Sequence, residues 1–333
     1  MPDGRLPLSI LDHSPVSAGS PLGDAFWHST KLAQLGEQFG YERYWVAEHH
    51  NMPAIAGSSP VVLAAHVAAQ TSAIRVGTGG LMLSNYSPLA AAEQMGLLEV
   101  LHPGRIDLGL GRAPGADQIT AYALRPSQED FQQQFAELLA FFRGNFPDDH
   151  PFSRIIATPG RGAIPAMWLL GSATYSAQLA GALGLPFAHG GHFAGGNSVN
   201  AVQTYHKAFR PSEMLQEPYA IVAVGAVCME TDELAQRYNQ AAYVSIVRSM
   251  TGTPGPLMSP EEVEAAPWAS ASDPHVAETW SHNIVGSPAT VKAGLEDLAT
   301  RTGADEIMIA NVMYGYENRL NSYRLIAAPC PPG

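Results

Sequence analysis

The residues best suited to chemistry lie at positions 44–51, which read YWVAEHHN. A short apolar run ends there in a carboxylate and two imidazoles, Glu48, His49 and His50. These groups can accept or donate protons near neutral pH, whereas a strand that leaves a core usually ends in turn-forming residues. The pattern predicts proton-transfer chemistry at the carboxyl end of a strand, with Glu48, His49 and His50 as candidate catalytic residues.

The two adjacent histidines are poor ligands for one metal ion. Neighbouring residues of a strand point to opposite faces, so His49 and His50 would face different sides. A metal-dependent barrel hydrolase would use His-x-His, and that spacing is absent. His189 and His192 lie near the end of another expected strand, but we expect no metal site. Hydrogen-bonded structural histidines are the plainer alternative for the first pair.

Glycines close two other apolar runs. In the segment VGTGGLM, the missing side chains of Gly79 and Gly80 would let a flat ligand approach the backbone, and Met82 could pack against its ring. A tight corner of the backbone is the alternative. The segment DLGLGRAPG matches a GxGxxG motif only superficially, because its spacing is wrong. Its Arg112 could hold a phosphate by charge-assisted hydrogen bonds, or form a surface ion pair.

The segment LLGSATYSA indicates a strand, a Gly-Ser turn and the start of a helix. Free backbone N–H groups at a helix amino terminus, with hydroxyls nearby, can cradle a phosphate. Ordinary capping by Ser172 or Thr174 is the alternative. A Walker-type GxxxxGK[ST] motif is absent, which disfavours nucleotide hydrolysis. The candidate cofactor-binding residues of this segment are Gly171, Ser172, Ala173, Tyr175 and Ser176.

Composition narrows the class of protein. Of 333 residues, 46% are hydrophobic and 14% charged, which suits a large buried core. A net charge of −12 without a basic cluster disfavours binding to nucleic acid or to an anionic membrane. Cys228 and Cys330 are expected to be free thiols. With no signal-peptide pattern and no apolar run long enough to span a bilayer, we expect a cytoplasmic enzyme.

Eight short apolar runs alternate with helix-like segments. The expected strands are 6–11, 44–47, 74–77, 105–108, 166–170, 186–189, 219–229 and 306–310. The expected helices are 24–39, 60–71, 88–101, 128–143, 173–183, 198–209, 232–250, 288–302 and 317–326. Gly40, Gly184 and Gly303 stand where helix C-caps belong. Continuous apolar strands in eight β-then-α units predict an α/β fold, a single (β/α)8 TIM barrel over residues 1–333. An open doubly wound sheet is the alternative.

Two stretches exceed simple connections, residues 145–165 and residues 251–283. Long loops inside a compact domain are usually functional lids or disordered. We expect residues 251–283 to form a lid insertion over the C-terminal mouth of the barrel. An insertion far from the site is the alternative.

With these elements in this order, the chain resembles the bacterial luciferase-like family of flavin-dependent monooxygenases. The matching residues are Leu11-Asp12, 44–50, 76–80, Ser87-Pro88, 92–94, 104–112, Gly171-Ser172 through Leu185-Pro186, 285–288, 303–306 and 319–323. They cover nearly the whole chain, and the Glu-His-His element with its flanking Trp45 is the most specific of them.

The resemblance implies a barrel that binds reduced FMN (FMNH2) at its C-terminal mouth. A separate NAD(P)H:flavin reductase usually supplies FMNH2, and O2 adds to form a C4a-(hydro)peroxyflavin that oxygenates an organic substrate. The resemblance places His49 near the flavin, and Arg112 with residues 172–176 at the phosphate. It also counts Asp12 among the cofactor-binding residues, and Gly79-Gly80 matches a non-prolyl cis peptide beside the flavin.

The resemblance further implies a homodimer through the second and third helices, where Ala64, Ala65, Ala68, Ala91 and Ala92 would permit close approach. Gly111 stands where light-emitting subunits carry a reactive cysteine, so aldehyde oxidation with light emission is not expected. We expect instead a family member that tailors secondary metabolites, such as aromatic polyketides. The alternatives are an F420-dependent hydride-transfer oxidoreductase and a non-catalytic flavin-binding partner subunit. The retained Glu48, His49 and His50 argue against the latter.

Overall fold

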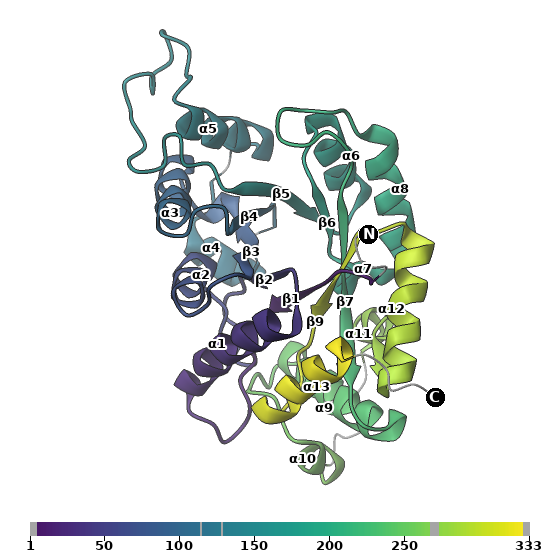
Figure 1. Ribbon diagram of the computed structural model, residues 1–333. Helices are drawn as coiled ribbons and strands as arrows, with labels where there is room; N and C mark the ends of the chain where they lie inside the picture. Colours follow the sequence, from purple (N-terminus) through teal and green to yellow (C-terminus); the bar gives the residue numbers. More distant parts are fainter. Residues whose placement is uncertain (1–4, 114, 128, 267–272, 329–333) are drawn as a thin grey trace.

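Eight parallel strands close into a barrel in the computed structural model, which describes residues 5–113, 115–127, 129–266 and 273–328 (Figure 1). They are β1 (Leu8–Asp12), β2 (Arg43–Val46), β3 (Arg75–Met82), β4 (Ile106–Gly111), β5 (Ala166–Gly171), β6 (Phe187–His189), β7 (Ala220–Cys228) and β9 (Glu306–Ala310). The pairing of β6 with β7 closes the ring. The predicted TIM barrel is confirmed, and all eight expected strands are present. A short strand that was not expected, β8 (Ile284–Gly286), pairs with the end of β7.

Helices cover the outside of the barrel. They are α1 (Leu22–Phe39), α2 (Pro60–Ala69), α3 (Pro88–Leu101), α5 (Phe131–Arg143), α6 (Thr174–Leu183), α8 (Ser198–Ala208), α9 (Asp232–Met250), α12 (Pro288–Thr302) and α13 (Tyr316–Ala327). α1, α6 and α12 end at left-handed Gly40, Gly184 and Gly303, as their sequence predicts. Residue 128, the expected start of α5, lies outside the described residues.

Four short helices were not expected, namely α4 (Gln118–Leu124), α7 (Gly191–Ala194), α10 (Pro260–Glu264) and α11 (Pro274–Trp280). Helices of one or two turns carry too little periodicity to be recognised from their sequence. α10 and α11 belong to residues 251–283. The described part of this segment is tied to the first loop of the barrel, since the Leu257 amide donates to the Val16 carbonyl over 2.7 Å.

Two apolar layers hold the barrel together. Inside it, Leu11, Trp45, Trp168, Ile221 and Met308 form one buried cluster. A larger cluster fills the space between the strands and the surrounding helices. Because both faces of the strands are covered, they carry the continuous apolar runs from which the barrel was predicted.

Buried ion pairs close the amino-terminal end of the barrel. Arg43 donates to Glu306 over 2.8 Å and to Asp107 over 2.9 Å, and Arg75 also pairs with Asp107. These residues begin or nearly begin β2, β9, β4 and β3, at the end opposite to the carboxyl ends of the strands. Their role is therefore structural, which is the general pattern for this end of a TIM barrel.

The alanines of α2 and α3 do not form an outer face. Ala64, Ala68, Ala91 and Ala92 are fully buried in the core of the subunit itself, and Ala65 is partly buried. The expectation that these small residues line a dimer interface is therefore wrong, because they are needed to pack the helices against the strands. Four large apolar side chains of these helices are exposed instead, namely Val62, Leu97, Val100 and Leu101. No helix in the described part of the chain is both long and apolar enough to cross a membrane.

Candidate active site

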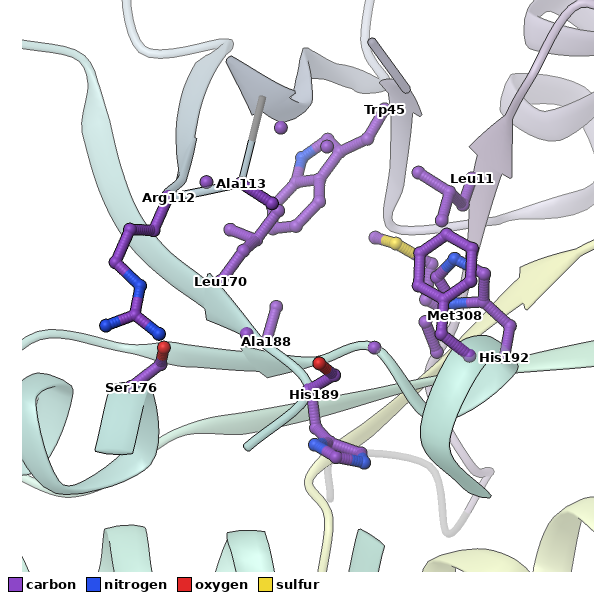
Figure 2. A pocket seen from close by; sticks show the side chains of 18 of the residues that line it. Leu11, Trp45, Arg112, Ala113, Leu170, Ser176, Ala188, His189, His192 and Met308 are labelled. Atoms are coloured by element: carbon purple, nitrogen blue, oxygen red, sulfur yellow. The ribbon is translucent and has the colours of Figure 1, made fainter. Parts of the chain in front are cut away.

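A cavity of about 200 Å³ opens at the carboxyl ends of the strands (Figure 2). Trp45, Leu170 and Met308 project into it from the barrel interior, and Arg112 and Ser176 stand at one side. The sequence-predicted cofactor residues that line it are Gly79, Gly80, Met82, Arg112, Gly171, Ser172, Ala173 and Ser176. Residues at the ends of β3, β4 and β5 therefore converge on the predicted position. We call this space the first cavity.

One wall of the first cavity has no room for side chains. The Gly79–Gly80 peptide is cis, as the resemblance implies, and the register between β3 and β4 shifts at this point. A Cβ atom on Gly79 would lie 2.8 Å from Leu11 Cδ1 and 2.9 Å from Trp45 Cβ, closer than real contacts allow. The backbone itself therefore forms the wall, which suits a flat ligand lying against it.

An anion cradle lies at the other side of the first cavity. α6 begins after Ala173 without a side-chain cap, so ordinary capping by Ser172 or Thr174 does not occur. The free N–H groups of this first turn, the two serines and Arg112 leave a concentration of donors there. Among the described residues Arg112 has no ion-pair partner, and its guanidinium stacks 4.7 Å from the centre of the Tyr175 ring. Tyr175 supports Arg112 rather than lining the cavity, and its hydroxyl accepts a hydrogen bond from Gln132 over 3.0 Å.

Glu48 and His50 face away from the cavities. The Glu48 carboxylate is buried and accepts hydrogen bonds from the Met82 amide over 2.9 Å, from Asn85 over 2.8 Å and from His50 Nε2 over 3.0 Å. Neither residue lines a cavity that the structure describes. The expected direct catalytic role of Glu48 and His50 therefore has no geometric support. Their contacts make them positioning residues that hold the strand tip against Met82.

His49 points the other way, into a second cavity of about 250 Å³. The ring centres of His49 and His192 lie 5.3 Å and 5.6 Å from that of His13. His192 and Phe193, from α7, line both cavities and so stand between them. Residues of β7 and β9 form the floor of the second cavity, and residues of α9 and α11 cover it.

These three imidazoles are neutral at pH 7. Burial, and then the charge of His50, lowers the pKa of His49 to about 4. Burial, and then His49 and His189, lowers the pKa of His192 to about 3. Burial, followed by both neighbouring imidazoles, holds the pKa of His13 well below its ordinary value. A neutral imidazole offers one donor and one acceptor, so each ring can hold or move a proton.

Asp12 lines neither cavity, so its predicted role in cofactor binding has no geometric support. It is fully buried and pairs with Arg319 over 2.7 Å, while Ser14, Ser29 and Tyr44 also donate to it. Burial alone would raise the pKa of Asp12, but Arg319 and the hydroxyl donors outweigh it and the pKa is lowered. Asp12 is an anchor that ties β1 to α13.

Sequence reasoning missed His13, Phe193 and Trp280, and it considered His192 only as a metal ligand. His13 directly follows a strand and could have been found as a polar residue at a strand tip. Trp280 lies in residues 251–283, where no pattern marks it. Among the described residues, no group of three or more His, Cys, Asp or Glu side chains is arranged to hold a metal ion.

The fold and the two cavities define a barrel enzyme with an anion cradle beside a flat-walled site. The family model for luciferase-like monooxygenases matches residues 8–306. A luciferase-like monooxygenase of Escherichia coli (strain K12) is 41% identical over 98% of this chain and 97% of its own. N-acetyl-S-alkylcysteine monooxygenase of Bacillus subtilis (strain 168) is 45% identical over 54% of this chain and 55% of its own.

A solved structure is also similar to this chain over nearly its whole length. The crystal structure of apo-MsnO8 superposes with a TM-score of 0.86 and 36% identity, over 97% of this chain and 98% of the other. This chain belongs to the luciferase-like monooxygenase family and is an enzyme, as its resemblance predicted.

Proposed function

We propose that this enzyme is an FMNH2-dependent monooxygenase that inserts one oxygen atom of O2 into a small organic substrate. The observation that carries the proposal is the pair of adjacent cavities that share His192 and Phe193. One has a flat backbone wall and an anion cradle, and the other has neutral imidazoles and apolar walls. A separate NAD(P)H:flavin reductase would deliver FMNH2, as the family resemblance implies.

The residues of the first cavity fit FMN. The wall of Gly79 and Gly80, with Met82 and Trp45, suits the ring system, and Arg112, Ser172 and Ser176 with the amino end of α6 suit the phosphate. Bound FMNH2 supplies the two electrons that activate O2. An F420 deazaflavin also carries a flat ring and a phosphate, so F420-dependent hydride transfer is the alternative.

The chain's own residues would supply the rest of the chemistry. His49, whose buried Nδ1 has no hydrogen-bond partner among the described residues, can take up or return a proton at the border of the second cavity. Val276, Thr279 and Trp280 of α11 cover that cavity, so residues 251–283 would act as its lid. Excluding water protects a reactive oxygenating species from side reactions.

Removing the guanidinium should show where the phosphate binds. We expect Arg112→Ala to weaken FMN binding by about 1.5–3 kcal/mol, the value of a hydrogen bond to a charged group. Fluorescence titration of FMN measures this, with Arg324→Ala as the control, because Arg324 is an exposed arginine of α13 that lines neither cavity. An unchanged affinity for Arg112→Ala would place the phosphate elsewhere.

Oxygen incorporation tests the function itself. The enzyme is mixed with FMN, a flavin reductase, NADH and a panel of organic compounds under isotopically labelled O2, and products are identified by mass spectrometry. A product heavier by one labelled oxygen supports the proposal. Turnover that proceeds equally well without O2 would favour hydride transfer. The panel includes aromatic polyketides, because a secondary-metabolite substrate stays a prediction.

The proposed enzyme is a homodimer. Val62 of α2 and Leu97, Val100 and Leu101 of α3 are exposed by 47–69%, and large apolar side chains exposed on neighbouring helices are typical of a contact surface. α2 and α3 are neighbours on the outside of the barrel (Figure 1). We expect light scattering to give twice the subunit mass, and Val100→Glu with Leu101→Glu to give the subunit mass. Leu183→Glu, on α6, is the control that should leave the mass unchanged. A monomeric parent protein would contradict the proposal.

A further inference from the structure

The second cavity has a composition that selects by charge. Its described lining holds no Lys, Arg, Asp or Glu side chain. The Arg319 guanidinium, whose charge acts on His13, is already paired with Asp12 at 2.7 Å. An ionised ligand would therefore lose its hydration without meeting an opposite charge.

The polar atoms that do face this region are uncharged and unused. Both ring nitrogens of His192 are buried without a hydrogen-bond partner among the described residues, and so is Nδ1 of His13 and of His49. Burying a donor or acceptor unpaired is unfavourable, so a ligand that satisfies one of them gains affinity. A neutral imidazole can donate to a carbonyl oxygen and can both donate to and accept from a hydroxyl.

Much of the remaining lining is apolar. Ile246, Val276 and Val227 present aliphatic side chains to the space. One hydrogen bond joins the two amides of the lining, since Asn283 Nδ2 donates to Asn239 Oδ1 over 3.1 Å. The Trp280 indole donates to the Asn239 carbonyl over 3.3 Å. The ligand body that fits these walls is apolar.

We propose that the second cavity selects an uncharged substrate with an apolar body and one carbonyl or hydroxyl group that hydrogen-bonds to the imidazoles. This inference rests on the proposed function, because it takes this cavity as the substrate site. It separates this enzyme from the N-acetyl-S-alkylcysteine monooxygenase of B. subtilis, because N-acetyl-S-alkylcysteine carries a carboxyl group.

Three probes of equal size test the charge rule, namely acetophenone, benzamide and benzoate. Their dissociation constants are measured by calorimetry at pH 7 with flavin-free protein, so no turnover is needed. We expect both neutral probes to bind at least about tenfold more tightly than benzoate, because an unpaired buried carboxylate is strongly disfavoured. Equal or tighter binding of benzoate would overturn the proposal, and so would the failure of all three to bind at millimolar concentration.

A cation placed in the cavity should reverse the preference. Ile246→Lys and, as a second variant at a less buried position, Thr279→Lys should raise the affinity for benzoate relative to acetophenone by about tenfold or more. Ile156→Lys adds the same charge at a side chain that is 60% exposed and should leave the ratio unchanged. If folded Ile246→Lys and Thr279→Lys proteins keep the parent ratio, the probes bind elsewhere and the proposal is wrong.

The imidazole contact has its own test. His192→Phe removes both unpaired nitrogens but keeps a ring of similar size. We expect it to weaken benzamide binding by about fivefold to tenfold and to leave the binding of ethylbenzene nearly unchanged. Equal losses for both compounds would assign His192 a purely structural role. Because all these measurements omit flavin and O2, they stand apart from the oxygen-incorporation assay.

Discussion

His49→Ala enzyme should reduce O2 almost as fast as the parent but release it as H2O2, with little oxygenated product. His49 is the one member of the Glu48-His49-His50 element that lines a cavity, and its imidazole is neutral because burial lowers its pKa to about 4. A positioned proton carrier of this kind contributes about 10²- to 10⁴-fold to a rate. We therefore expect product formation to fall by that factor. FMN affinity should change little, because His49 does not line the first cavity.

The measurement compares product, H2O2 and NADH consumed in the same reaction. His50→Gln is the matched comparison, since His50 contacts Glu48 and faces no cavity; it should lower product formation by less than about tenfold. His66→Ala, at an exposed position of α2, should have no effect. An unchanged product yield in His49→Ala would remove the role assigned to this histidine.

Arg319→Ala should lower the free energy of unfolding by about 3–5 kcal/mol, the value for breaking a buried ion pair. Asp12 and Arg319 are both buried and lie 2.7 Å apart, so the loss of one leaves the other charged without a partner. Urea denaturation measures the change. Arg301→Ala is the matched control, because Arg301 pairs with Asp297 on the exposed face of α12 and such a pair contributes about 0.5 kcal/mol or less.

The conservative change Asp12→Asn separates an anchoring role from a cofactor role. We expect it to destabilise the protein, while the fraction that stays folded binds FMN with the parent affinity. This follows from the position of Asp12, whose oxygens are occupied by Arg319, Ser14, Ser29 and Tyr44. A large loss of FMN affinity with unchanged stability would restore the role that the sequence suggested for Asp12.

Local patterns in the sequence were sufficient to predict the barrel and much of the first cavity. These patterns are local: continuous apolar runs, glycines that end helices and the segment VGTGGLM each involve a few consecutive residues. They can therefore be interpreted without knowledge of the fold. The Arg112 position and the turn after β5 were found in the same way. Short helices and β8 were missed because their runs are too brief to carry a period.

The sequence by itself determined that a carboxylate and two imidazoles stand at the tip of β2, beside a glycine wall and a helix terminus. Only the tertiary structure decided that His49 lines a cavity while Glu48 and His50 hold the strand tip against Met82. The reason is that β2 ends at Val46, so the turn that follows sets the direction of each side chain. Only the tertiary structure also brought His13, His192 and Trp280 to one space. Their encounter depends on long-range packing of loops, which no local pattern encodes.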